Sequence, residues 1–147
     1  MVVYGTCSGN AELVANAIRD GLCETELDVE IERSEAIKAE IVKDYHLIVM
    51  VASTWNVGKL NDNFVNFDKE FKTMDLKDKK VAVVGLGDSE NYDIFCGAAD
   101  ILEASVEKAG ATKLGESLRI DGPPHGRLGE YKDWGRNLAL SFLAENA

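Results

Sequence analysis

Short apolar runs alternate along the chain with longer stretches in which apolar residues recur every three or four positions. The runs are Met1–Tyr4, Val29–Ile31, Leu47–Ala52, Val81–Val84 and a mixed segment, Thr112–Ile120. Strands that are apolar along most of their length are typical of a parallel sheet covered by helices on both faces. These runs therefore predict five strands of one such sheet.

Four stretches between or after the runs have the spacing of amphipathic helices. Their apolar positions fall within residues 13–22, 64–71, 98–109 and 131–142, and Gly110 is placed to end the third. The segment Glu35–Lys43 is long enough for only one or two helical turns. Because strands and helices alternate strictly, right-handed crossovers predict an open, doubly wound, three-layer α/β fold.

Charge narrows the classes of function. The chain has 16 Lys and Arg residues against 26 Asp and Glu residues, for a net charge of -10. Nucleic acids and anionic membrane surfaces need a basic face, so neither is an expected partner. A strongly negative surface instead attracts basic proteins.

Length and cysteine content indicate the number of domains and the class of protein. The 147 residues fit a single domain over residues 1–147. No apolar run approaches the roughly 18–20 residues of a membrane span, and the first residues enter a strand, so we expect no signal peptide. Cys7, Cys23 and Cys96 form no CxxC pair. We therefore expect neither a disulfide framework nor a zinc site, and we expect a cytoplasmic protein.

The loop after the first strand has the composition of a phosphate site. Ligands of open α/β sheets bind beyond the carboxyl ends of the strands. The loop Gly5–Ala11 is small, rich in hydroxyl groups and followed by a helix, whose N-terminus favours anions. It lacks the lysine of a nucleoside triphosphate site and the GxGxxG of a dinucleotide site. It therefore fits one terminal phosphate, with an ordinary strand-to-helix turn as the alternative.

The loop after the third strand, Ser53–Leu60, places Trp55 at the carboxyl end of that strand. An indole at this position is suited to stack on a flat heterocycle. The alternative is a tryptophan folded back onto the core.

The loop after the fourth strand, Gly85–Tyr92, runs on to Phe95 and Cys96. It begins like a dinucleotide fingerprint, but Glu90 stands where the third glycine should be. We interpret its two glycines as allowing the backbone to close on a ligand whose other face Tyr92 covers. The alternative is a polar loop with one surface tyrosine.

Together, the three loops place a phosphate site and two aromatic side chains at one edge of one sheet. This combination describes a site for a flat, three-ring system that carries a ribityl phosphate. The sequence here resembles the flavodoxin family over nearly its whole length, in the segments YGTCSGNAE, STWNVGKLNDNF, GLGDSENYDIFCGAAD and KLGESLRIDG. The first segment is similar to the T/S-x-T-G-x-T phosphate loop of that family. Ser8 replaces its middle threonine and keeps the hydroxyl, whereas Ala11 replaces the last and removes one.

The resemblance implies a five-stranded parallel sheet of order 2-1-3-4-5 and a tightly but non-covalently bound FMN. The residues that would hold the FMN phosphate are Thr6, Cys7, Ser8, Gly9, Asn10 and Ala11, with Ser53 or Thr54 nearby. The residues that would surround the isoalloxazine are Trp55 and Tyr92 on its faces, Asn56 and Val57 beside N5, and Gly58 in the same loop. Those that would bond its pyrimidine edge are Leu86, Gly87 and Asp88, and those that would line the rim are Phe95 and Cys96.

Other reactive side chains have plainer interpretations. His46 and His125 lack a metal-ligand spacing. We interpret Cys96 as a packing cysteine, because the sequence indicates no basic residue or helix start beside it to lower its pKa. The acidic residues on the helix after the second loop are expected to be mostly solvated, and they could repel added negative charge on a flavin: Asp62, Asp68 and Glu70.

The resemblance implies a low-potential one-electron carrier, not an enzyme, that shuttles electrons between redox enzymes. Its expected partners are basic proteins such as an NADPH-dependent or pyruvate-type oxidoreductase, and we expect a monomer. Two alternatives remain: an FMN-dependent quinone or nitro-compound reductase, which needs a substrate pocket, and a partner-binding module without FMN. The length is similar to short-chain flavodoxins and TWNVG to long-chain ones, so we assign no subgroup.

Overall fold

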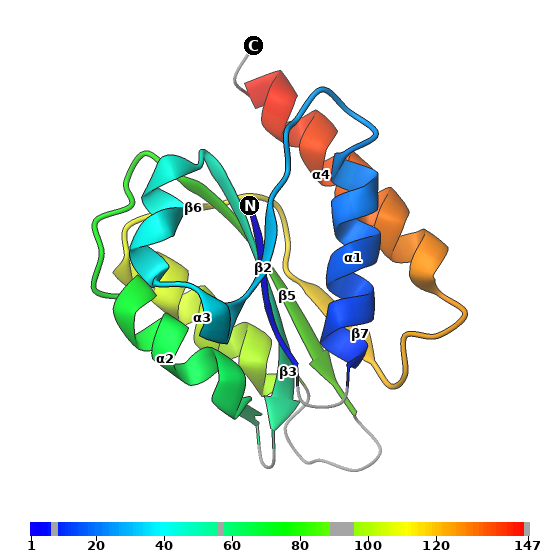
Figure 1. Ribbon diagram of the computed structural model, residues 1–147, viewed down its shortest axis with the longest axis horizontal. Coiled ribbons are helices and arrows are strands. Elements are labelled where there is room, and N and C mark those ends of the chain that lie inside the picture. The colour runs from blue at the N-terminus through cyan, green and yellow to red at the C-terminus, as the bar shows by residue number, and fades with distance from the viewer. Residues whose placement is uncertain (7–8, 56–57, 89–95, 146–147) are drawn as a thin grey trace.

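The computed structural model describes residues 1–6, 9–55, 58–88 and 96–145 and has three layers (Figure 1). Helices α1 and α4 cover one face of the sheet, and α2 and α3 cover the other. The helices are α1 (Asn10–Leu22), α2 (Asp62–Phe71), α3 (Gly97–Lys108) and α4 (Leu128–Glu145), with short 3-10 helices at Ser34–Ala36 and Ala39–Asp44. The doubly wound α/β prediction is confirmed.

The parallel sheet has the order β2-β1-β3-β5, with β6 and β7 both beyond β5. Its strands are β1 (Val2–Gly5), β2 (Ile31–Arg33), β3 (Leu47–Trp55), β5 (Lys80–Gly87), β6 (Thr112–Lys113) and β7 (Leu118–Asp121). All of these pairings are parallel, as expected.

The predicted order of the five expected strands is confirmed, and the structure differs in two details. A two-residue strand, β4 (Lys59–Leu60), folds back antiparallel onto the end of β3 and shifts the numbering. The expected fifth strand, Thr112–Ile120, is interrupted at residues 114–117. Gly115 there has a φ of 71°, which extended strand backbone does not adopt.

Strand β3 shows why the central runs are apolar throughout. Ile48 and Met50 belong to the core under α2 and α3, whereas Val49 and Val51 belong to the core under α1 and α4. Successive side chains of a strand point to opposite faces, and here both faces are covered. All four side chains are fully buried.

Helices α1 and α4 touch through their backbones. A Cβ atom on Gly21 would collide with the carbonyl oxygen of Lys132, and one on Gly135 would collide with the carbonyl oxygen of Ile18. Each glycine therefore admits the other helix at a distance that a larger residue would prevent. This contact fixes α1, whose N-terminus faces the candidate site, against the last helix of the chain.

Asp68 departs from the expectation of a solvated acidic face on α2. Asp62 and Glu70 are exposed, but Asp68 is only 5% exposed, and its Oδ1 has no hydrogen-bond partner among the described residues. Burial raises the pKa of the Asp68 carboxyl above its ordinary value, and Ser105 and Lys72 only partly oppose this. The Asp68 carboxyl therefore ionises less readily in the folded protein than in the unfolded chain.

We expect Asp68→Asn to stabilise the protein at neutral pH. At low pH, Asp68 is protonated in both the folded and the unfolded chain, so its raised pKa does not change the free energy of unfolding. As the pH rises, the carboxyl ionises more readily in the unfolded chain, and this lowers the free energy of unfolding. The stability gain of Asp68→Asn should therefore grow between about pH 3 and pH 7, as measured by urea unfolding. Asp62→Asn, at an exposed position of the same helix, is the control and should show no such trend. A gain for Asp68→Asn that is equal at all pH values would contradict the assignment.

Candidate functional site

A hollow of about 190 Å³ opens at the carboxyl edge of the sheet, where β3, β5 and β7 end beside the start of α1. Its lining residues are Asn10, Ser53, Thr54, Leu86, Gly87, Asp88, Gly122 and Pro123. The first six come from all three loops that the sequence singled out. The last two were missed, although their position directly after the fifth strand could have indicated this same edge.

The first loop leads into a helix N-terminus without a side-chain cap. Gly9 is the N-cap of α1 with a φ of 89°, and none of the described side chains accepts a hydrogen bond from the first turn. The hydroxyl oxygen of Thr6 instead accepts a hydrogen bond from the backbone N–H of Gly9, at 2.9 Å. The N–H groups of the first turn are thus donors for an anion. Cys7 and Ser8 lie outside the described residues.

Asn61, fully buried, joins the first loop to the second. Its Nδ2 donates to the carbonyl oxygen of Gly5 at 2.7 Å and to that of Ser53 at 3.3 Å. Its Oδ1 accepts from the backbone N–H of Asn63 and so caps α2. The Nδ2 of Asn63 donates to the carbonyl oxygen of Thr6 at 2.7 Å. These two amides were missed as site-building residues; an asparagine before a periodic apolar helix is, however, an N-cap signal.

In the second loop, the side-chain hydroxyl of Thr54 is hydrogen-bonded to the backbone of α3. Its Oγ1 accepts a hydrogen bond from the N–H of Ala98, at 3.2 Å. Gly58 has a φ of 74° and lies so close to Gly97 that a Cβ on Gly97 would collide with it. The backbone of Trp55 ends β3, while its side chain, like Asn56 and Val57, is outside the described part.

The two glycines of the third loop make room for α3. A Cβ on Gly85 would lie 2.7 Å from the Cβ of Ala99, and one on Gly87 would lie 2.8 Å from the backbone nitrogen of Cys96. The interpretation that both glycines let the backbone close on a ligand is therefore wrong for Gly85. Gly87 also lines the hollow and keeps its place in the predicted site. Tyr92 and Phe95 lie outside the described residues.

Cys96 is a packing cysteine, but not for the reason expected. Helix α3 starts directly after it, and Arg119 donates to its carbonyl oxygen at 3.4 Å, so both features thought to be missing are present. Burial nevertheless outweighs the nearby Arg119 and raises the pKa of the Cys96 thiol to about 11. The thiol therefore stays protonated and unreactive at neutral pH.

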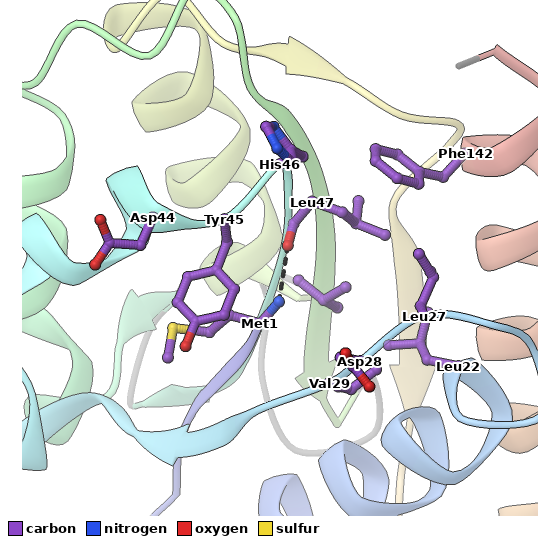
Figure 2. A pocket seen from close by; sticks show the side chains of 11 residues that line it. Met1, Leu22, Leu27, Asp28, Val29, Asp44, Tyr45, His46, Leu47 and Phe142 are labelled. Carbon is purple, nitrogen blue, oxygen red and sulfur yellow. Dashed lines mark hydrogen bonds between the residues drawn. The ribbon is translucent and has the colours of Figure 1, made fainter. Parts of the chain in front are cut away.

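A more apolar hollow of about 160 Å³ lies at the opposite, amino-terminal edge of the sheet (Figure 2). Leu22, Leu27 and Phe142 face it, and the amino group of Met1 donates to the carbonyl oxygen of Leu47 at 2.8 Å. The carboxylates at its border, from Asp28 and Asp44, would repel a phosphate. This second hollow shares no lining residue with the hollow at the carboxyl edge.

The described residues contain no group of three or more His, Cys, Asp and Glu side chains that could hold a metal ion. His46 and His125 are both exposed. None of the described helices is long and apolar enough to cross a membrane.

Comparison with known proteins assigns the family. The flavodoxin family model matches residues 2–134. The chain belongs to the flavodoxin family. It is 37% identical to a flavodoxin of Maridesulfovibrio salexigens over 142 residues, 95% of each chain. Its fold is similar to oxidised flavodoxin 1 of Bacillus cereus, with a TM-score of 0.87, 30% identity and 95% of each chain covered, and to a Streptococcus pneumoniae flavodoxin, with a TM-score of 0.88, 25% identity and coverages of 96% and 97%.

Membership confirms the main functional expectations. Flavodoxins bind FMN and transfer electrons, so this flavodoxin is an FMN-binding electron carrier and not an enzyme. The alternatives of a quinone reductase and of an FMN-free module are not favoured. The residues at the carboxyl edge fit the cofactor, because an uncapped helix N-terminus and the neutral polar side chains of Asn10 and Ser53 suit its phosphate.

Asn61→Asp should destabilise this flavodoxin by about 3 kcal/mol, because it replaces the buried Nδ2 donor with a carboxylate that faces the carbonyl oxygen of Gly5. The N-cap acceptor for α2 is kept, so the loss reports the link between the two loops. Asn63→Ala removes one exposed hydrogen bond and should cost less than about 1 kcal/mol. Urea unfolding of the apoproteins measures both changes, and equal losses would contradict the role given to Asn61.

Proposed function

We propose that this flavodoxin is a low-potential, one-electron carrier whose FMN lies at the carboxyl edge of the sheet, held by the residues of the three loops. The observation that carries the proposal is the uncapped N-terminus of α1 beside a hollow whose lining includes the neutral polar side chains of Asn10, Ser53 and Thr54. Bound FMN supplies the one-electron chemistry, and the protein supplies binding, orientation and the electrostatic environment.

The phosphate is assigned to Thr6–Ala11, with Ser53 nearby. The first N–H groups of α1 would donate to it, assisted by the helix dipole. Gly9 supports this assignment, because a Cβ at this position would meet no atom of the described, non-adjacent residues within 4 Å, which leaves space for a ligand. Neutral donors let a chain of net charge -10 bind an anionic group without a lysine or arginine in the loop.

The isoalloxazine is assigned to the other two loops. Trp55 and Tyr92 would stack on its faces, Asn56, Val57 and Gly58 would lie beside N5, and the rest of the site is Leu86, Gly87, Asp88, Phe95 and Cys96. The described lining of the hollow contains no lysine or arginine, and it contains the carboxylate of Asp88. Such surroundings disfavour added negative charge on the ring, which supports a low potential.

The partners that fit are basic redox proteins, such as an NADPH-dependent or pyruvate-type oxidoreductase. The net charge of -10 would steer them to the surface. We further propose a monomer of one domain, residues 1–147, in the cytoplasm. The two cores on opposite faces of one sheet support a single folding unit.

Replacing either stacking ring should weaken FMN binding. Trp55→Ala and Tyr92→Ala each remove an aromatic contact of about 1–3 kcal/mol, so the dissociation constant should rise about tenfold to hundredfold. Fluorescence titration of the apoproteins measures it, with riboflavin in parallel, which should lose affinity by the same factor. Trp134→Ala is the control, because Trp134 lies on α4 and packs against the core between the sheet and helices α1 and α4. Unchanged affinity in both ring variants would refute the stacking assignment.

Electron transfer to a basic partner should slow with salt. Surface charges beyond about 8–10 Å are screened at physiological ionic strength. We therefore expect the second-order rate constant with a basic NADPH-dependent reductase to fall about tenfold between low and high salt. Reduction by a small uncharged reductant serves as the control and should stay constant. A flat salt profile with the reductase would remove the argument for a basic partner.

A further inference from the structure

The turn that follows β7 forms one wall of the hollow at the carboxyl edge of the sheet. Gly122 and Pro123 line this hollow, although neither belongs to the three loops assigned to the cofactor. Gly122 has a φ of 76°, a conformation that favours glycine and that turns the chain at the end of the strand. Its backbone N–H donates to the carbonyl oxygen of Gly87 at 2.9 Å, and Gly87 lines the same hollow. A backbone hydrogen bond therefore joins this wall to the third loop.

The guanidinium of Arg127 holds the carbonyl groups on either side of Gly122. Its Nη2 donates to the carbonyl oxygen of Asp121 at 2.7 Å and to that of Pro123 at 3.1 Å. The backbone N–H of Arg127 also donates to the carbonyl oxygen of Pro124 at 3.1 Å and closes the next turn of the chain. Because one nitrogen atom serves both carbonyl groups, the backbone before and after Gly122 is held in a fixed arrangement.

The place of Arg127 in the chain is unusual for a cation. It directly precedes α4, which begins at Leu128. Positive charge is unfavourable beside a helix N-terminus, where Ser, Thr, Asp and Asn are preferred because they accept hydrogen bonds from the first turn. The guanidinium instead donates to the wall, and its Cζ lies 6.0 Å from the ring centroid of the buried Tyr131. Its contacts with the wall, not the start of α4, therefore explain an arginine at this position.

We propose that Arg127 is a positioning residue of the cofactor site. By holding the carbonyl groups of Asp121 and Pro123 together, it fixes the wall formed by Gly122 and Pro123 before the cofactor binds. A wall that is already fixed loses less conformational entropy on binding, so the affinity for the ligand is higher. The proposal rests on the proposed function, in which FMN lies at the carboxyl edge of the sheet.

The test compares the apoproteins of Arg127→Met and Arg136→Met. Arg136 is a second arginine near α1, and its guanidinium pairs with Glu24 and Asp133, which do not line the hollow. We expect the FMN dissociation constant, measured by fluorescence titration, to rise about fivefold in Arg127→Met, the worth of about one hydrogen bond. It should stay unchanged in Arg136→Met.

Two further measurements separate positioning from attraction between the Arg127 cation and the phosphate of FMN. Riboflavin lacks the phosphate, so loss of the fixed wall should weaken riboflavin and FMN by the same factor in Arg127→Met. Arg127→Lys keeps the charge but replaces the planar guanidinium with a compact ammonium on a flexible stem. It should therefore bind FMN about as weakly as Arg127→Met.

Hydrogen exchange of the Gly122 amide reports on the wall itself, because this amide donates to Gly87. In apoprotein Arg127→Met, exchange at Gly122 should accelerate, while the amide of Val49, in the buried centre of the sheet, should keep its wild-type rate. A general loss of stability would accelerate exchange at both amides and would contradict a local role.

Four results would each overturn the proposal: wild-type affinity in Arg127→Met, an equal loss in Arg136→Met, a loss confined to FMN, or full rescue by Arg127→Lys. The placement of FMN is tested separately, by adding FMN to the wild-type apoprotein and following the backbone amide resonances of Asn10 and Gly122. Both should shift. If FMN binds and neither shifts, the proposed placement fails and the proposal fails with it. If both shift while Arg127→Met binds FMN normally, only the role of Arg127 is refuted.

Discussion

The close approach of α3 to the edge of the sheet is the contact on which the candidate site depends. Gly85 and Gly87 leave room for Ala99 and Cys96, and Gly97 lies against Gly58 of the second loop. A side chain at any of these glycines would push the helix away from the strand ends. Because α3 lies so close, its first N–H groups can reach Thr54, and the second and third loops share one backbone framework.

An acidic protein that binds an anionic cofactor must overcome the repulsion between like charges, and the phosphate site proposed for the first loop would do so without a cation. Peptide N–H groups at the start of α1 offer partial positive charge that is fixed in direction. A lysine would bind phosphate more strongly in general, but it would also stabilise added negative charge on a nearby ring. Neutral donors separate these two effects, so the phosphate can be held while the surroundings of the ring remain unfavourable to charge.

The sequence predicted the parts of the fold that periodicity encodes. The continuous run Leu47–Ala52 indicated a strand buried on both faces, and it is one. The sequence also predicted that a hollow would lie at the carboxyl edge of the sheet, because ligands of open α/β sheets bind beyond the ends of the strands. These inferences need only local patterns and general rules of chain topology.

What the sequence did not reveal depends on contacts between distant segments. The partner of Gly85 is a helix residue fourteen positions later, so its spacing could not distinguish a ligand from a helix. Asp68 resembles any exposed acid of an amphipathic helix until the packing of α2 on α3 is known. Asn61 likewise signals only a helix cap, because its second role requires the carbonyl oxygen of Gly5, 56 residues away.

The contact between α1 and α4 has a consequence for biosynthesis. Among the described helices, α1 is made first and α4 last, yet their backbones meet at Gly21 and Gly135. Until α4 has emerged from the exit tunnel, α1 lacks the helix that packs against its backbone at Ile18 and Gly21. A nascent chain can therefore form much of its sheet before the contact between α1 and α4 exists, so the packing of α1 is completed only after α4 has been made.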